Sequence, residues 1–333
     1  MLPSSPPLYR TLLPLLFLPS LSTSSDPSLF DPLFSRYTMF PLTSAAYSDD
    51  PLGCLDTVSN TTQLISFVKA KCDMWSDMCA GYIAYIPEFD AAVLAFRGTQ
   101  GTVQLTTEIM DMINERPVPL DAGGKVGPYF KQGFDALWEG GMEEAFMLLV
   151  ATQSFSQLWI TGHSLGGSMA SIAAATVVHD LGIPGAKIRL MTYGEPRTGN
   201  PTFVDTVDGE IASMFRVVHD RDIVVHTPPN ALGYKQHRQE IFYDNDMTDI
   251  YDYVSCEGDE DPSCSDGYWD LSADDHMYYY QLEIADYGKQ GCVGSTGPEP
   301  KMRDRSREIR QFEEAVRLIN VRSKLGLLNT TDL

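Results

Sequence analysis

Basic residues are scarce in this sequence of 333 residues. Lys and Arg together number 24 against 45 Asp and Glu, and the formal net charge at pH 7 is −21. Because a surface of that charge repels phosphate groups, the composition argues against nucleic acid as a partner. The sequence also lacks internal repeats and long low-complexity tracts, so we expect one large domain with short appendages.

Ligand-binding motifs are missing as well. No Cys and His spacing is typical of a zinc site, and no Gly-x-Gly-x-x-Gly or P-loop pattern indicates a nucleotide site. Residues 244–275 contain twelve acidic residues and no Lys or Arg, yet they lack the spacing of an EF-hand calcium loop. We therefore expect no cofactor and no metal, and we interpret the acidic segment as a solvated loop.

Long apolar runs are absent too. A transmembrane helix needs about 20 apolar residues, and no segment provides them. The run at residues 11–21 is too short, follows one basic residue, Arg10, and precedes small residues, which is the pattern of a secretory signal. We predict a signal peptide at residues 1–24 and a secreted protein, against the alternative of a disordered Pro- and Ser-rich tail.

The cysteine count agrees with secretion. Six cysteines, an even number, suit an oxidising compartment and can form three disulfides. Glycosylation sequons begin at Asn60 and Asn329, which adds weak support for an extracellular protein. The alternative is a cytosolic protein with buried free thiols.

Apolar runs of four to eight residues predict buried strands, and helical patterns lie between some of them. Strands are expected at residues 81–86, 91–96, 158–161, 188–193 and 215–218, and helices at 137–152 and 165–181. Strands that alternate with helices over short links indicate an α/β fold, a mostly parallel sheet covered on both faces. We expect this single domain at residues 25–297, with its ligand site beyond the carboxyl ends of the strands.

Residues 162–166 read Gly-His-Ser-Leu-Gly, directly after one predicted strand and directly before a predicted helix. In this Gly-x-Ser-x-Gly arrangement, a sharp turn raises the serine hydroxyl above the sheet, and the helix amino terminus offers free N–H groups to an oxyanion. The bare pattern also occurs by chance as a structural turn, but here both flanking elements are in place. We therefore predict that Ser164 is a catalytic nucleophile and that the N–H of Leu165 stabilises the oxyanion. His163 is expected to pack nearby and not to act as the base.

A serine nucleophile needs a base, and the base needs an orienting acid, in the order Ser, then Asp or Glu, then His. Asp220 and Asp222 both follow the strand at 215–218, and the residues alone leave the two nearly even. The histidines beyond them are His226, His237 and His276. His226 is too close to Asp222 in the same loop, and His237 lies among polar neighbours and is interpreted as exposed surface.

Five blocks of the sequence resemble the class 3, fungal-type lipases, in the family's order. They are residues 160–167 around Ser164, Ala-Phe-Arg-Gly-Thr at 95–99, Tyr-Gly-Glu-Pro-Arg-Thr-Gly-Asn at 193–200, residues 220–229, and Asp-His-Met-Tyr-Tyr-Tyr at 275–280. The resemblance covers about residues 37–292, and the segments at 260–264 and 286–289 resemble secreted nematode members. The family implies an α/β-hydrolase fold and ester hydrolysis.

Further assignments come from the resemblance. It selects Asp222 as the acid and His276 as the base, and it places Thr99 beside Leu165 in the oxyanion hole. Fungal members join the start of the domain to its end by a disulfide, so the implied pairs are Cys54–Cys292, Cys72–Cys79 and Cys256–Cys264. The family also implies a short lid after Thr99, with an apolar face formed by Val103, Leu105, Ile109, Met112 and Ile113. A plain surface helix is the alternative for that segment.

The substrate is expected to be a lipid or another ester, with transient contact to lipid surfaces, and the sequence carries no signal for an oligomeric state. A triacylglycerol lipase is the first hypothesis. The alternatives are a feruloyl-type or other carboxylesterase, a phospholipase, and an inactive lipid-binding secreted protein, which the complete set of Ser164, Asp222 and His276 disfavours.

Residues 298–333 lie outside the resemblance. Ile309, Phe312, Val316 and Ile319 recur at helical spacing, and eight basic residues lie between positions 301 and 324. This pattern predicts a basic amphipathic helix. We expect it to dock on the body of the protein with its arginines facing the acidic segment at 244–275, against the alternative of lying on an anionic membrane.

Overall fold

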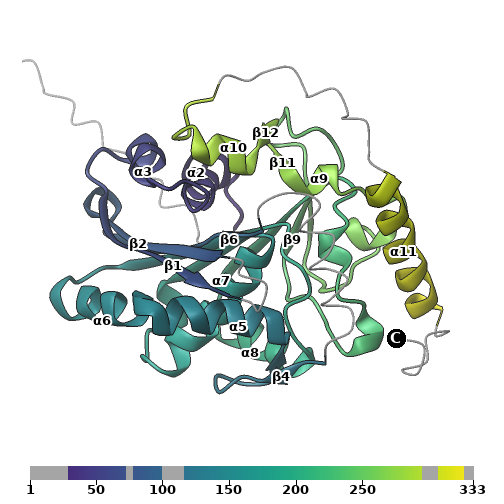
Figure 1. Cartoon of the computed structure of the whole chain (residues 1–333), viewed down its shortest axis with the longest axis horizontal. Helices are drawn as coiled ribbons and strands as arrows, with labels where there is room; N and C mark the ends of the chain where they lie inside the picture. Colours follow the sequence, from purple (N-terminus) through teal and green to yellow (C-terminus); the bar gives the residue numbers. More distant parts are fainter. Residues whose placement is uncertain (1–28, 73–77, 100–115, 295–306, 326–333) are drawn as a thin grey trace, which may run out of the picture.

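The structure, a computed structural model, describes residues 29–72, 78–99, 116–294 and 307–325. Within them an eight-stranded sheet runs in the order β1-β2-β3-β6-β7-β8-β9-β10 (Figure 1). The strands are β1 (Gln63–Lys71), β2 (Met78–Ile86), β3 (Ala91–Phe96), β6 (Gln157–His163), β7 (Ile188–Tyr193), β8 (Ser213–His219), β9 (Glu240–Tyr243) and β10 (Val254–Cys256). The five central strands, β3, β6, β7, β8 and β9, are parallel. β1 and β2 are added at one edge and β10 at the other, each by antiparallel pairing. The predicted α/β fold is confirmed.

The central strands form because their residues are apolar at nearly every position. All six residues of β3 are buried, and in β6 only the first residue is partly exposed. Strands of this kind must be covered on both faces, which favours a parallel arrangement. The five predicted strands are confirmed, whereas β1, β9 and β10 were not predicted.

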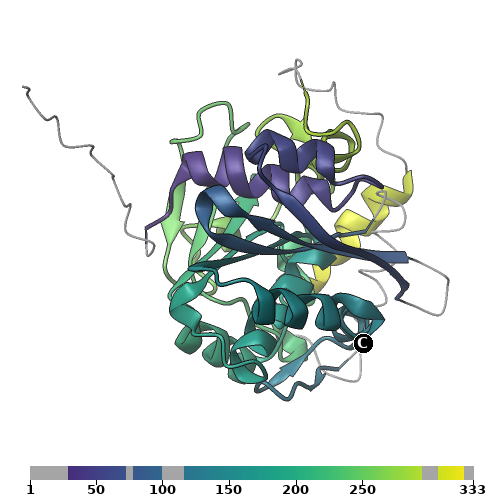
Figure 2. The same cartoon turned by 90° about the vertical axis from the view of Figure 1, so that its left-hand side faces the viewer.

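Helices cover both faces of the sheet (Figure 2). One face carries α5 (Pro128–Leu137), α6 (Glu143–Thr152), α7 (Leu165–His179) and α8 (Pro201–Glu210), and the other carries α1 (Pro32–Phe34), α2 (Phe40–Ala45), α3 (Leu52–Val58) and α10 (Ile284–Lys289). Each layer has its own buried apolar cluster. The helix predicted at 137–152 is interrupted by a π-helical turn, Trp138–Met142, where Gly141 adopts a φ of 124° that few other residues tolerate.

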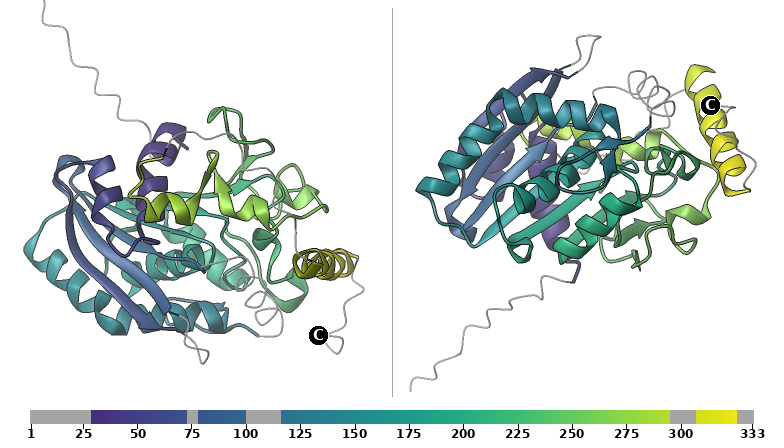
Figure 3. Two further views of the ribbon diagram at one scale, coloured as in Figure 1. Left: turned by 45° about the horizontal axis from the view of Figure 1, so that its top comes forward. Right: turned by 90° about the horizontal axis from the view of Figure 1, so that it is seen from below.

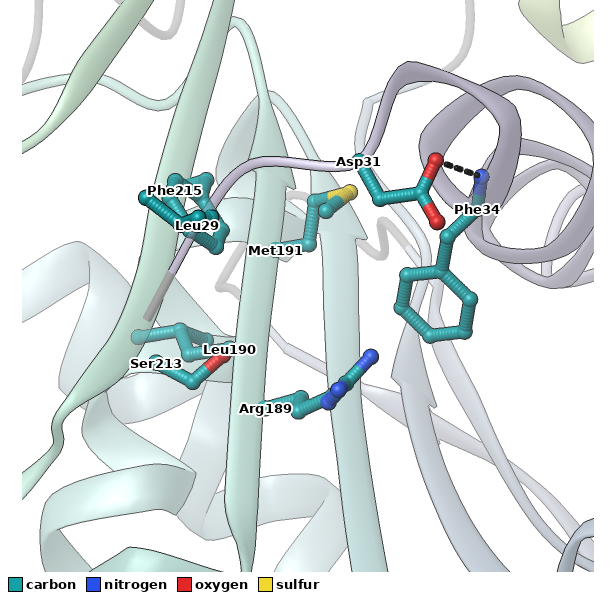
Figure 4. A pocket seen from close by; sticks show the side chains of 8 residues that line it. All are labelled: Leu29, Asp31, Phe34, Arg189, Leu190, Met191, Ser213 and Phe215. Carbon is teal, nitrogen blue, oxygen red and sulfur yellow. Dashed lines mark hydrogen bonds between the residues drawn. The ribbon is translucent and has the colours of Figure 1, made fainter. Parts of the chain in front are cut away.

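The amino-terminal segment crosses the sheet near the beginnings of β7 and β8 (Figure 4). Asp31 caps α1 by accepting hydrogen bonds from the N–H groups of Leu33 and Phe34, and the Phe34 ring stacks on the guanidinium of Arg189. These residues border a shallow pocket whose lining is Leu29, Asp31, Phe34, Arg189, Leu190, Met191, Ser213 and Phe215. Arg189 and Ser213 lie near the beginnings of β7 and β8, so this pocket lies at the end of the sheet opposite to the carboxyl ends of the strands. Catalytic residues are expected at the carboxyl ends.

Three disulfides join the cysteines in the pairs that the resemblance implied. Cys72–Cys79 and Cys256–Cys264 close short loops, and Cys54–Cys292 links positions 238 residues apart. The long link ties α3 to the segment after α10, so the start and the end of this helical layer are held together. The predicted pairing is confirmed.

The carboxy-terminal helix α11 (Arg307–Lys324) lies against the body of the protein (Figure 3). Val316 is 1% exposed within the larger apolar cluster, and Ile319 packs against it. The Nζ atom of Lys324 lies 2.8 Å from a carboxylate oxygen of Asp266. The predicted docking is confirmed for the described residues, but Arg317 pairs with Glu314 within the helix, so a lysine makes the described contact to the acidic segment.

The interpretation of residues 244–275 as a solvated loop is wrong for part of the segment. Cys256 and Cys264 are buried in a small cluster of their own beside β8 and β9. Glu260 and Asp266 face Arg197, whose side chain is only 2% exposed. A buried guanidinium needs carboxylate partners, so these acidic residues serve as its counter-ions.

Further elements complete the chain. They are the two-stranded ribbons β4 (Val118–Pro119) with β5 (Lys125–Val126) and β11 (Tyr278–Tyr279) with β12 (Leu282–Glu283), and the short helix α9 (Asp274–Met277). The proposed lid helix at 103–113 and the proposed signal peptide lie outside the described residues.

Candidate active site

Ser164 stands on a strained turn between β6 and α7. Its φ of 59° and ψ of −131° form a conformation that costs a residue with a side chain about 1–3 kcal/mol. The surrounding glycines permit the turn: a Cβ on Gly162 would lie 2.0 Å from the carbonyl oxygen of Gly166, and one on Gly166 would lie 2.2 Å from that of Phe96. The Gly-x-Ser-x-Gly motif is therefore required by close backbone approach. Strain that persists in this way is typical of functional sites.

The turn places donors for an oxyanion near the serine. Leu165 is the first residue of α7, where the N–H groups of a helix lack intrahelical partners. Thr99 follows β3 and is buried, and the preceding Gly98 packs so closely that a Cβ there would lie 2.9 Å from the Cβ of Ser164. The two predicted oxyanion residues thus lie on backbone adjoining Ser164.

Asp222 and His276 form a fully buried pair, both 0% exposed. The Nδ1 atom of His276 lies 3.0 and 2.9 Å from the two carboxylate oxygens of Asp222. The Nε2 atom of His276 is buried and has no hydrogen-bond partner among the residues that the structure describes. The ring of His163, the residue before Ser164, lies 4.4 Å from the ring of His276, so the neighbour of the candidate nucleophile contacts the candidate base.

Backbone pairing brings the acid and the base together across 54 residues of sequence. The N–H of Ile223 donates to the carbonyl of Ser272, and the N–H of Ser272 donates to the carbonyl of Arg221. Four residues after Ser272, the short helix α9 presents His276 to Asp222.

The environment of Asp222 favours its charged form. Its carboxylate accepts hydrogen bonds from the N–H of Val224 at 2.8 Å and from the hydroxyl of Tyr279 at 3.2 Å, besides the contact with His276. Burial alone raises the pKa of Asp222, but His276 and the hydrogen bonds outweigh burial and hold this pKa below its ordinary value. The acid therefore stays ionised and can stabilise a positive charge on His276.

The structure separates the two aspartates that the sequence left open. Asp220 has a half-exposed side chain that pairs with Arg221 at 2.7 Å, and burial with the neighbouring Asp275 raises its pKa. Asp222 is the one that contacts His276. His226 is buried in the loop after Asp222, and burial lowers its pKa to about 3.

The interpretation of His237 as exposed surface is wrong. His237 is 2% exposed, and its Nε2 atom lies 3.1 Å from Glu195, a carboxylate that the sequence reasoning did not single out. Glu195 also accepts hydrogen bonds from the hydroxyls of Ser171, Thr192 and Thr198 at 2.6–2.7 Å. These contacts of Glu195 join helix α7, which begins directly after Ser164, to the segment after β7. Its location in the matched block 193–200 was the available signal.

Tyr279 and Arg197 were likewise not singled out. Tyr279 donates to Asp222 and lies three residues after His276, within the matched block 275–280. Arg197 donates to the carbonyls of His226 and Pro228 and pairs with Glu260, which holds the loop that follows Asp222.

The described residues contain neither a candidate metal cluster nor a candidate membrane-spanning helix. Across residues 29–72, 78–99, 116–294 and 307–325, no group of three or more His, Cys, Asp or Glu side chains is arranged to hold a metal ion. Over the same ranges, no helix combines the length and the apolar character needed to cross a bilayer.

Comparisons with known proteins agree with this geometry. The family model of class 3 lipases matches residues 93–232. A lipase of Caenorhabditis elegans is 32% identical over 306 residues, which covers 79% of this chain and 84% of that protein. A secreted mono- and diacylglycerol lipase of Fusarium solani is 34% identical over 126 residues, or 37% of each chain.

Solved structures support the fold independently. The crystal structure of a lipase from Rhizopus microsporus var. chinensis has a TM-score of 0.66 at 24% identity, over 77% of this chain and 90% of that chain. Lipase II of Rhizopus niveus has a TM-score of 0.63 at 24% identity, over 75% and 94%. With a relative that is 32% identical along most of its length, this chain belongs to the class 3 lipase family of carboxylic ester hydrolases.

Proposed function

We propose that this protein is a secreted triacylglycerol lipase that acts through an acyl-enzyme on Ser164. The observation that carries the proposal is the buried Asp222–His276 pair, stacked on the residue before a strained serine between β6 and α7. Such a set of nucleophile, base and orienting acid is the machinery of acyl transfer.

The first half of the reaction follows from the hydrogen bonds. Because Nδ1 of His276 donates to Asp222, the lone pair of that ring is on Nε2, to which none of the described residues hydrogen-bonds. Nε2 takes the proton of Ser164 as its Oγ attacks the ester carbonyl, and the ionised Asp222 stabilises the imidazolium that forms. The N–H of Leu165 and the Thr99 turn stabilise the oxyanion of the tetrahedral intermediate.

The second half reverses the proton transfer. The imidazolium of His276 gives its proton to the departing alcohol, which leaves an acyl group on Ser164. Water then enters, loses a proton to Nε2 and attacks the acyl carbon. As the second intermediate collapses, the bond between the acyl carbon and Oγ breaks, His276 returns the proton to Ser164, and the fatty acid leaves. No step needs a cofactor or a metal.

Two further points support a lipid substrate and secretion. The Caenorhabditis elegans relative is named a lipase, and the Fusarium relative is named a secreted mono- and diacylglycerol lipase. Three disulfides, without a free cysteine among the described residues, suit an oxidising compartment. We expect transient contact with lipid surfaces during catalysis.

An ester series tests the proposal. Hydrolysis of p-nitrophenyl esters from acetate to palmitate is measured beside emulsified triolein, with Ser164→Ala as the matched control. A lipase hydrolyses the long-chain esters and the emulsion, and the control loses these activities while it keeps the unfolding temperature. Activity confined to the shortest esters would favour a carboxylesterase, and near-wild-type activity of Ser164→Ala in a preparation free of other esterases would refute the mechanism.

A further inference from the structure

His163 lies between Tyr47 and the candidate base His276. It is fully buried, and its ring lies 4.4 Å from that of His276 at an interplanar angle of 28°. Its Nδ1 atom is 2.6 Å from the hydroxyl of Tyr47, and its Nε2 atom is 2.8 Å from the backbone carbonyl of His276. One side chain therefore contacts both the ring and the backbone of the base.

The two hydrogen bonds define the proton position on His163. A carbonyl oxygen only accepts, so Nε2 of His163 must carry the proton and donate to His276. Nδ1 then accepts from the hydroxyl of Tyr47. This assignment describes a neutral imidazole in one tautomer, inferred from the partners.

A neutral ring suits this location. Burial, together with the adjacent His276, lowers the pKa of His163 to about 3, so the ring carries no charge at neutral pH. A charged neighbour would oppose the positive charge that His276 must acquire during each acyl transfer. A neutral ring at the same place leaves that charge to Asp222.

Tyr47 and His163 also lie next to the turn at Gly98, which precedes the predicted oxyanion residue Thr99. A Cβ on Gly98 would lie 2.5 Å from the Tyr47 hydroxyl and 2.4 Å from the carbonyl of His163, so Gly98 packs directly on both residues. Tyr47 follows α2 and lies in the apolar layer on that face of the sheet. The pair thus connects this layer to the base and to the backbone before Thr99.

We propose that His163 is a positioning residue for the hydrolytic reaction, held by Tyr47, that keeps the ring of His276 aligned between Asp222 and Ser164. The proposal rests on the proposed function, because it assigns His276 as the base. A ring that only filled space would need neither hydrogen bond. The two polar contacts of His163 are therefore the features to remove.

Three variants separate positioning from space filling. His163→Phe keeps a stacked ring but loses both hydrogen bonds, and His163→Gln keeps a donor and an acceptor. Tyr47→Phe removes the hydroxyl that donates to Nδ1 and leaves His163 itself unchanged. Tyr82→Phe is the matched control, because Tyr82 is fully buried in the same apolar layer and donates to the carbonyl of Leu42 at 2.6 Å.

Soluble p-nitrophenyl butyrate is the substrate, and kcat, KM and the pH profile of kcat/KM are measured beside the unfolding temperature. We expect His163→Phe to lower kcat about 10- to 100-fold with KM within about threefold, since small misplacement of a base is costly. The pH profile of kcat/KM should also differ from that of wild type, because His276 is no longer held against Asp222. Tyr47→Phe should lower kcat about 3- to 10-fold, and His163→Gln should recover part of the activity that Phe loses.

Tyr82→Phe is expected to lose stability with kcat and the pH profile unchanged. The proposal is overturned if Tyr47→Phe behaves like Tyr82→Phe and the folded His163 variants keep kcat within threefold. If His163→Phe does not fold, the comparison of kcat between Tyr47→Phe and Tyr82→Phe tests the proposal. A wild-type enzyme that hydrolyses no ester would refute the proposed function itself, a different outcome from active variants with unchanged kinetics.

Discussion

Neutralising Glu260 is a direct test of the buried charge cluster that holds the loop after Asp222. Glu260 accepts from Nε and Nη2 of Arg197 at 2.9 and 2.8 Å, and its own side chain is 18% exposed. Burial alone raises the pKa of Glu260, but the Arg197 guanidinium outweighs burial and lowers the pKa from 4.5 to about 2. Glu260→Gln keeps the side-chain size and removes the charge.

The pKa difference sets the size of the effect. A group whose pKa is lower in the folded protein stabilises it above the unfolded pKa, and this contribution is lost as the pH falls through the folded pKa. At 1.36 kcal/mol for each pH unit between 4.5 and about 2, the contribution is about 3 kcal/mol at pH 7. At pH 3 the same relation leaves about 1 kcal/mol.

Guanidinium chloride unfolding of wild type and Glu260→Gln at pH 7 and pH 3, without reductant, measures these differences. Asp270→Asn is the control, because Asp270 is 79% exposed in its 3.3 Å contact with Arg221, and such a surface pair is expected to contribute less than about 0.5 kcal/mol. A destabilisation below about 1 kcal/mol at pH 7, or one equal at both pH values, would contradict the reasoning.

Three further outcomes follow from the described contacts. Asp222→Asn should lower kcat by about three to four orders of magnitude in the ester assay with little change in fold, because the base loses its ionised partner; a loss below tenfold would count against it. Cys54→Ser with Cys292→Ser should lower the free energy of unfolding by about 2–5 kcal/mol, measured against wild type by denaturant titration, and no change would show that the long link is dispensable. A chain that ends at residue 297 should melt at a lower temperature, because it lacks the buried Val316 and the Lys324 partner of Asp266. Its relative activity on soluble and anionic-vesicle substrates should be unchanged. Unchanged stability with a selective loss on vesicles would instead support membrane attachment of α11.

The central part of the fold could be predicted because its signal is local. β3 and β6 are continuous apolar runs, and such runs predict buried strands without knowledge of their neighbours. β1 alternates between exposed and partly buried positions at the edge of the sheet, and β10 has only three residues. Their pairing depends on partners elsewhere in the chain, which periodicity does not reveal.

The same distinction applies to the residues of the site: those with a local signal could be predicted, and those that depend on distant partners could not. Ser164 was predictable because its motif and both flanking elements are contiguous, whereas Asp222 and His276 needed the resemblance. His237 was misjudged because its neighbours in sequence are polar, while its burial depends on Glu195, 42 residues away. The acidic segment was misjudged for the same reason, since its counter-ion Arg197 lies before β8.

These non-local contacts explain how a strained serine can persist at the centre of the site. Ser164 holds its conformation because β6 and α7 are each anchored in a layer of their own, α7 through Ser171 to Glu195 and the end of β6 through His163 to Tyr47. The base is held on the same side by the His163 contact and on the other by Asp222. The strained turn is thus constrained by contacts from both faces of the sheet, at the carboxyl end of β6.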